Sequence, residues 1–179
     1  MISYGKSTSS DGKFLYLFHN DEMEMQENRN ACTNSPSCLV AAKLYSIYKT
    51  TSYLKTAQTL YGFCIANMPD AERVEEPPLT YTQGTFGEAC RQLFRLTGDV
   101  KYKEKAGAVL AYTFRGNRCI DSASGVLRDE GSNMDQSIFK AVFVPYAVNY
   151  VLDESMDKST RNYLQERLVN CANRLSGTL

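Results

Sequence analysis

The sequence predicts an all-α domain of stacked antiparallel helical hairpins, of the α/α toroid or solenoid kind. Two observations support this prediction. Apolar residues recur at helical spacing in six segments that are separated by turn residues. Residues 44–63 also match residues 93–112 at a constant offset of 49, so that Leu44 pairs with Leu93 and Tyr53 with Tyr102. A repeat of this length, made of two helices and a turn, cannot bury both of its faces alone, so neighbouring hairpins must stack.

The six helices are expected in order along the chain. They span about residues 36–49, 53–67, 82–97, 99–112, 135–152 and 158–175. Ser35 is expected to cap the first helix just ahead of Pro36, and Gly98 ends the third. The first, third and fifth helices are apolar almost all round, whereas the others alternate with charged residues. This difference predicts an inner layer of helices buried on two sides and an outer layer with one solvent-exposed face.

The rest of the chain is expected to form loops, and no segment is predicted as a strand. Residues 1–29 are assigned to an irregular N-terminal segment, and residues 30–179 to the helical domain. We expect residues 1–25 to fold over an open edge of the hairpin stack. Two long connections, residues 70–79 with Pro77 and Pro78 and residues 116–133, are expected at the end where the inner helices begin.

The overall composition excludes several classes of function. Lys plus Arg and Asp plus Glu both number 20, so no net charge favours a nucleic acid partner. No apolar run reaches the length of about 20 residues that a membrane span requires. The chain has one histidine, and no two of its six cysteines have the two-residue spacing of a zinc or redox motif. No metal site and no cofactor are therefore expected. We expect Cys38, Cys64, Cys90 and Cys171 to be buried thiols on apolar helix faces.

Polar and aromatic residues recur where the inner helices begin. They are Asn30, Asn34, Tyr81, Gln83, Asp135, Phe139 and Lys140. Hydrogen-bonding groups interleaved with aromatic rings suit a sugar, which offers hydroxyl groups and a CH face. Helix capping is the simpler alternative, since Asn34 and Thr80 are common capping types and Gln83 completes a capping box with Thr80. Capping does not explain Tyr81, so a carbohydrate-binding rim is predicted.

Four stretches resemble glycoside hydrolase family 76, the endo-α-1,6-mannanases. They are RNACTNSPSCLVAAKLY at 29–45, LTYTQGTFGEACRQLFRLTGDVKYKEKA at 79–106, GVLRDEG at 125–131 and DQSIFKAVFVPY at 135–146. The resemblance implies an (α/α)6 toroid that cuts α-1,6-linked mannan in a secreted, periplasmic or cell-surface setting. It also implies that the seven rim residues line the glycan cleft. Thr82 and Pro145 depart from the residues usual in that family.

The resemblance covers the C-terminal half of the family fold. Family members carry their catalytic pair as adjacent aspartates in the N-terminal half, and this chain contains no Asp-Asp dipeptide. It has three hairpins where a closed toroid needs six. The carboxyl groups of Asp129, Glu130 and Asp135 are the in-chain candidates for an acid and base pair, whereas Glu75/Glu76 and Asp153/Glu154 are expected to face solvent.

Three functions remain open from the sequence. The chain is part of a mannanase-like enzyme and binds mannan, or it is a half-toroid that dimerises to close the ring, or it is a helical-repeat module that binds a protein. Aromatic residues on the inner helices, Tyr48, Phe86, Phe139 and Phe143, favour some closure because a bare half-ring would show an apolar patch to water.

Overall fold

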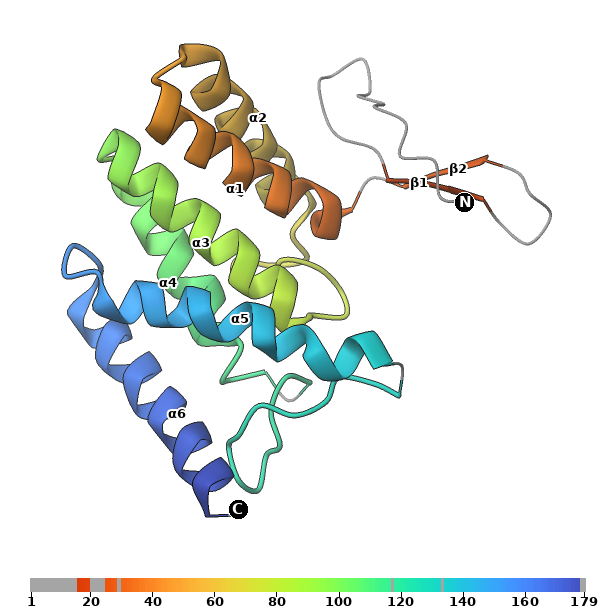
Figure 1. Cartoon of the computed structure of the whole chain (residues 1–179), viewed down its shortest axis with the longest axis vertical. Coiled ribbons are helices and arrows are strands. Elements are labelled where there is room, and N and C mark those ends of the chain that lie inside the picture. Colours follow the sequence, from red (N-terminus) through yellow and green to blue (C-terminus); the bar gives the residue numbers. More distant parts are fainter. Residues whose placement is uncertain (1–15, 20–24, 29, 117, 133, 178–179) are drawn as a thin grey trace.

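In the part of the chain that the structure describes, six helices follow one another as three antiparallel pairs (Figure 1). The computed structural model describes residues 16–19, 25–28, 30–116, 118–132 and 134–177. The helices are α1 (Ala31–Tyr48), α2 (Thr51–Asn67), α3 (Thr80–Thr97), α4 (Val100–Tyr112), α5 (Met134–Leu152) and α6 (Lys158–Ser176). Short turns join the two helices of each pair, and two long connections join successive pairs. The predicted hairpins are therefore confirmed.

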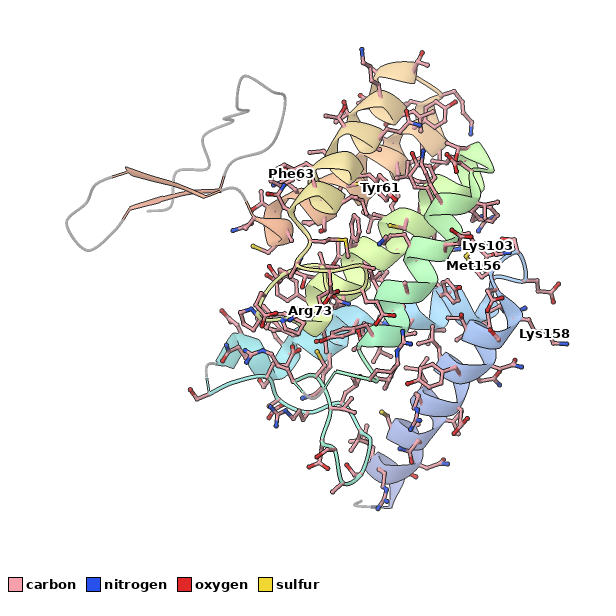
Figure 2. All side chains as sticks on the ribbon, turned by 180° about the vertical axis from the view of Figure 1, so that it is seen from behind. Tyr61, Phe63, Arg73, Lys103, Met156 and Lys158 are labelled. Carbon is pink, nitrogen blue, oxygen red and sulfur yellow. The ribbon has the colours of Figure 1, made fainter. Side chains whose placement is uncertain are left out.

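The pairs stack in two layers. α1, α3 and α5 lie side by side in the inner layer, with α3 between the other two (Figure 1). α2, α4 and α6 form the outer layer, which Figure 2 shows from behind, with Lys158 of α6 pointing away from the stack. Tyr61 of α2 joins the layers, because its ring stacks on Phe86 at 5.8 Å between centroids and meets Tyr102 edge-on at 4.7 Å.

α3 is the most deeply buried helix because it has neighbours on three sides. Two glycines let those neighbours approach closely. A Cβ atom added at Gly84 would lie 2.8 Å from the Cα atom of Phe143 on α5, and one at Gly87 would lie 2.6 Å from the Cγ atom of Leu110 on α4. Because glycine has only a hydrogen atom as its side chain, α3 can approach α5 at Gly84 and α4 at Gly87.

The expectation that all inner helices are buried on two sides is confirmed for α3 alone. α1 and α5 lie at the two ends of the stack, and each carries exposed apolar residues on its outward face. Of the four aromatic residues expected to be exposed, Phe86 and Phe143 are fully buried in the core, since α3 and α5 pack against each other there. Tyr48 is 64% exposed and Phe139 is half-buried.

α1 begins five residues earlier than expected. Asn30 caps it, since its side-chain oxygen accepts a hydrogen bond from the Thr33 amide at 3.0 Å. Pro36 therefore lies inside the helix, where its missing N–H group removes one backbone hydrogen bond. The Asn30 cap and the packing of α1 against α2 and α3 outweigh this loss, and the expected cap at Ser35 was wrong.

A two-stranded hairpin precedes the helices and was not expected. β1 (Tyr16–His19) pairs antiparallel with β2 (Met25–Asn28), with Tyr16 opposite Asn28. These strands fall within the segment that was expected to be irregular. Figure 1 draws the hairpin beside the start of α1, away from α5 and α6. Most of the segment expected to cover an open edge of the stack lies outside the described residues.

A buried ionic network lies at the opposite end of α3 from its start. Arg91 is hydrogen-bonded to Glu88 at 2.8 Å and to Asp153, in the turn after α5, at 2.6 Å. Asp153 was expected to be solvated, but its side chain is only 11% exposed because Arg91 draws it against α3. Burial opposes ionisation of Asp153, yet hydrogen bonds from Ser155 and Arg91 lower its pKa below the usual value.

The cysteines are free thiols in the structure. Cys38, Cys64, Cys90 and Cys119 are buried, whereas Cys32 and Cys171 are half-buried. Burial raises the pKa of the Cys64 thiol to about 11, so this group stays protonated at neutral pH. Within the described residues, no cluster of His, Cys, Asp and Glu has the arrangement of a metal site. None of the described helices is long and apolar enough to cross a membrane.

Candidate functional site

The starts of α1, α3 and α5 lie at one end of the stack, and we call this end the rim (Figure 1). The inner helices run in the same direction, because each is connected to the next through an outer helix that runs back. Both long connections, residues 68–79 and 113–133, also return to this end. Groups that are far apart in the sequence thus meet at the rim.

Two aromatic rings form one part of the rim. Tyr81, in the first turn of α3, lies against Phe139 of α5 with 4.5 Å between ring centroids and 50° between ring planes. Both side chains are half-buried, so each ring keeps an edge in water. The sequence predicted both residues for the site, and the close packing of α3 on α5 brings them together.

The Tyr81 hydroxyl group points toward the start of α1. It lies close to the Cys32 thiol, which donates a hydrogen bond to the Asn30 side-chain oxygen at 2.9 Å. Burial, together with the neighbouring Cys32 thiol, raises the pKa of Tyr81 above its ordinary value, so the phenol stays neutral. Asn30 and Tyr81 thereby belong to one connected group of polar side chains.

Glu130 fixes the second long connection to the start of α3. Its two carboxylate oxygens accept hydrogen bonds from the Thr80 backbone amide at 2.7 Å and from the Thr80 hydroxyl at 2.9 Å. Its side chain is buried, and Arg118 donates to its backbone carbonyl at 3.1 Å. Thr80 is therefore a docking point for this loop and not the helix cap expected from the sequence, because the helix begins with Thr80 itself.

Glu75 is the rim carboxyl group that the sequence did not identify. It was expected to face solvent within the proline-rich connection, but it is largely buried, and its Oε1 atom is shielded from water without a hydrogen-bond partner. Burial raises its pKa, and the nearby charge of Glu130 raises it further, although the Thr82 hydroxyl group opposes the shift. This carboxyl group donates and accepts a hydrogen bond when it is protonated, and it offers two acceptor oxygens when it is ionised.

A pocket opens beside these groups. It has a volume of about 420 Å³ and is lined by residues that include Asn30, Phe63, Asn67 and Glu75. Its wall combines two amides, the carboxyl groups of Glu75 and Glu76, and an aromatic ring. Such a wall offers hydrogen bonds to hydroxyl groups and an apolar surface to CH groups.

Two residues predicted for the site are structural in this molecule. Gln83 is fully buried, and its amide donates to the carbonyl groups of Glu72 and Val109 and accepts from the Val74 amide at 2.6 Å. It therefore holds the loop that carries Glu75, and it forms no capping box. Asn34 is also fully buried and donates to the Asn30 carbonyl oxygen at 2.8 Å. Neither amide faces the rim.

The remaining predicted residues lie on the solvent-exposed side of the rim. Lys140 forms an ion pair with Asp129, whose side chain is 59% exposed, and Asp135 in the first turn of α5 is exposed. Asp129 and Glu130 differ in environment, because one faces water and the other is buried on Thr80. These adjacent carboxyl groups are therefore not arranged around a common space.

The sequence model of glycosyl hydrolase family 76 matches residues 17–179. The chain belongs to glycosyl hydrolase family 76. A comparison with curated proteins found no match. The family 76 chain is similar in structure to the GH76A α-1,6-mannanase from Salegentibacter sp. HEL1_6, with a TM-score of 0.74 and 24% identity over 83% of this chain and 48% of that one.

Two further structures show the same fold. An inactive variant of the Salegentibacter enzyme, with two adjacent aspartates replaced by alanine, is in complex with α-1,6-mannotetrose and gives a TM-score of 0.73 at 24% identity, over 81% of this chain and 47% of that one. The Lin0763 protein from Listeria innocua gives 0.67 at 23% identity, over 81% and 43%. The family 76 chain thus spans about half the length of these proteins and has the fold of the C-terminal part of an (α/α)6 toroid.

Proposed function

We propose that the family 76 chain binds α-1,6-linked mannan at the rim and forms one wall of a glycan cleft. The observation that supports this proposal best is the meeting of Tyr81, Phe139, Asn30 and Glu75 at the common end of three inner helices. A related enzyme of the same fold is a mannanase, and its inactive variant is in complex with an α-1,6-linked mannose oligomer.

The rim residues have distinct roles in this proposal. The Tyr81 and Phe139 rings contact the CH face of a mannose unit, since aromatic faces and edges suit weakly polar CH groups. Glu75 and Asn30 bind hydroxyl groups, because the unpaired Oε1 atom of Glu75 gains a partner there. Asp135 and Lys140 lie on the exposed side of the rim and contact sugar units farther along the mannan.

Hydrolysis of the glycosidic bond is assigned to the closed toroid. It requires two carboxyl groups separated by about 5 to 5.5 Å or about 6.5 to 9.5 Å around the bond. The inactive mannanase variant lacks two adjacent aspartates, and this sequence has no such pair. We therefore propose that this chain positions the glycan, while the acid and base come from a complementary half. Asp129, Glu130 and Asp135 are the in-chain residues to replace if the chain alone cleaves mannan.

Calorimetric titration of the purified chain with α-1,6-mannotriose tests the proposal. We expect saturable binding that weakens about tenfold, or about 1.4 kcal/mol, when Tyr81 is replaced by Ala. Tyr48→Ala is the matched control, because Tyr48 is an exposed tyrosine at the opposite end of α1 and its loss should leave the affinity unchanged. Absence of heat for mannotriose, with binding of a protein partner instead, would favour the interaction-module alternative.

A homodimer that closes a six-hairpin ring is the second arrangement in which a complete toroid forms. Each copy supplies three hairpins, and the apolar faces of α1 and α5 lie at the two ends of the stack. Light scattering decides this point. A dimer has twice the mass of 20.1 kDa, and a monomer at every concentration excludes it.

A further inference from the structure

The pocket beside Glu75 extends beyond the inner helices. Its lining comes from three places, namely the start of α1, the last turns of α2 and residues 69–76 of the first long connection. α2 belongs to the outer layer, and Figure 2 shows Phe63 on α2 and Arg73 on the loop that follows it. The pocket therefore leads from the inner layer of the rim toward the outer layer.

The aromatic pair of the rim lies outside this pocket. Tyr81 and Phe139 belong to α3 and α5, and neither of them lines it. Asn30 connects the two regions, because it lines the pocket and accepts a hydrogen bond from the Cys32 thiol, which lies close to the Tyr81 hydroxyl group. A glycan that follows the inner helices over the two rings thus passes the mouth of the pocket and leaves its far end unfilled.

The far end of the pocket is closed by protein on three sides. Ala31 of α1, Phe63 of α2, and Pro69 and Val74 of the loop belong to its walls. The volume of about 420 Å³ lies within the range of about 300–1,000 Å³ that is usual for small-molecule sites. A glycan backbone that continues in both directions cannot pass through such a space. It can, however, send a substituent into it.

The far end offers groups that suit a sugar. Asn67 is exposed, and its Nδ2 atom donates to the Phe63 carbonyl oxygen at 2.8 Å, while its Oδ1 atom accepts no hydrogen bond from the described residues. The Oε1 atom of Glu75 also has no hydrogen-bond partner. Phe63 and Val74 add apolar surface. Hydroxyl groups can pair with the two free oxygens, and CH groups can contact the apolar wall.

The charges of the pocket restrict the kind of substituent. Glu75 and Glu76 line it, and no Lys, Arg or His is among the described residues that do so. Arg73 lies on the same loop, but it is already paired with Asp70 at 2.6 Å and with Glu76. A phosphate or another anionic substituent would therefore meet carboxyl groups without a free cation, which is unfavourable. The lining favours a neutral substituent.

We propose that this pocket receives a single neutral sugar that branches from the mannan backbone. This inference rests on the proposed binding of mannan at the rim, and it adds a preference for a branched glycan over a linear one. Glu75 lies where both the backbone and the branch can reach it, whereas Asn67 contacts only the branch. Asn67 is thus the residue that determines the preference.

Calorimetric titration of the full chain tests the preference. Linear α-1,6-mannotriose is compared with three tetrasaccharides in which its central unit carries one further mannose at O2, O3 or O4. At least one branched isomer is expected to bind about tenfold more tightly than the linear trisaccharide, and an analogue with phosphate in place of the branch should bind no more tightly than the linear one.

The outcomes separate this inference from the proposed function. Binding of the linear trisaccharide, with no gain for any of the three branched isomers, would overturn the inference and leave the proposed function intact. Tighter binding of the phosphate analogue would overturn the neutral character of the branch. Failure of every glycan to bind would refute the proposed function itself.

A variant of Asn67 locates the branch. Asn67→Ala should remove most of the gain from the branch and leave the affinity for linear mannotriose unchanged. Asn162→Ala is the matched control, because Asn162 is an exposed asparagine of α6 outside the pocket. If Asn67→Ala weakened linear and branched glycans equally, the backbone itself would occupy the pocket and the inference would be wrong.

Hydrogen exchange of the wild-type chain gives a second readout that does not depend on the folding of a variant. Residues 63–69 should exchange more slowly with the preferred branched isomer than with linear mannotriose, because only the branch reaches α2. Residues 128–140 should be slowed to the same extent by both glycans. Equal protection of residues 63–69 by the two glycans would contradict the proposed position of the branch.

Discussion

Glu75 is a carboxyl group held out of water at the rim, and this position has a cost. A raised pKa means that the folded state prefers the protonated form, so stability is lost as the pH rises through the pKa of Glu75. We expect Glu75→Gln to raise the free energy of unfolding at pH 8 relative to the wild type, and to leave it unchanged or lower at pH 4. Urea unfolding at the two pH values checks this.

The same variant should bind mannotriose more weakly at pH 8, because an amide has one acceptor oxygen, whereas an ionised carboxylate offers two to sugar hydroxyl groups. Gain of stability with loss of binding is typical of a residue retained for function. Glu104→Gln is the matched control, since Glu104 is an exposed glutamate on α4 and lies outside the pocket. If Glu75→Gln destabilised the chain at pH 8, the carboxylate would be stabilising the fold instead.

Arg91 holds two acidic side chains in the interior at the other end of α3. We expect Arg91→Ala to lower the free energy of unfolding by about 3–5 kcal/mol, because Glu88 and Asp153 would remain buried without their partner. Arg95→Ala should cost no more than about 1 kcal/mol, since Arg95 is 57% exposed and lies 3.9 Å from Asp153. Thermal and urea unfolding of both variants would reveal whether the network has this asymmetry.

Acid should weaken the contact between Arg91 and Asp153. The folded pKa of Asp153 is lowered, so its contribution is complete above the unfolded pKa of about 3.9 and is lost as the pH falls through the lower folded value. Asp153→Asn should therefore be less stable than the wild type at pH 7, with the difference shrinking below about pH 4. A difference that stayed constant down to pH 2 would show that the charge of Asp153 is unimportant.

At the level of elements, two glycines test how closely α3 is packed. Gly84→Ala should destabilise the chain by about 1–3 kcal/mol, because the added methyl group would meet the backbone of α5 at Phe143. Gly62→Ala should stabilise it by about 0.5–1 kcal/mol, since this helical glycine of α2 has open space around its Cβ position. Similar effects of the two changes on the melting temperature would mean that α3 and α5 are not in close contact.

The helices could be predicted because each carries an apolar stripe of helical period, and the 49-residue repeat related the first hairpin to the second. The start of α1 was missed because Pro36 resembles a first-turn proline, whereas the cap is Asn30. The hairpin of β1 and β2 was missed because two strands of four residues give too short an alternation to identify.

Only part of the candidate site could be predicted from the sequence. Helical periodicity placed Tyr81 at the start of the third helix, and the contact with Phe139 follows from the packing of α3 on α5. Gln83 was misplaced because one turn of a helix carries neighbours to different faces, and sequence position alone does not say which face is inward. Glu75 was missed because the burial of a loop residue depends on the tertiary contacts of the whole loop.

For the whole molecule, the thiols report on the integrity of the stack. Cys38, Cys64, Cys90 and Cys119 are buried and should react with a thiol reagent only after global unfolding, whereas Cys32 and Cys171 should react in the native state. Mass spectrometry after brief alkylation is expected to show two modified positions without denaturant and six with it. Rapid alkylation of Cys38 or Cys90 in the native chain would indicate that the hairpins separate readily.

The glycan account depends on a single rim shared by α1, α3 and α5. Hydrogen exchange with and without α-1,6-mannotetrose, read by mass spectrometry of peptides, tests this claim most directly. The account predicts slower exchange in residues 30–34, 72–83 and 128–140, and no change at the opposite ends of the same helices, residues 45–52, 94–101 and 150–157. Protection confined to the opposite ends, or none at saturating glycan, would contradict it.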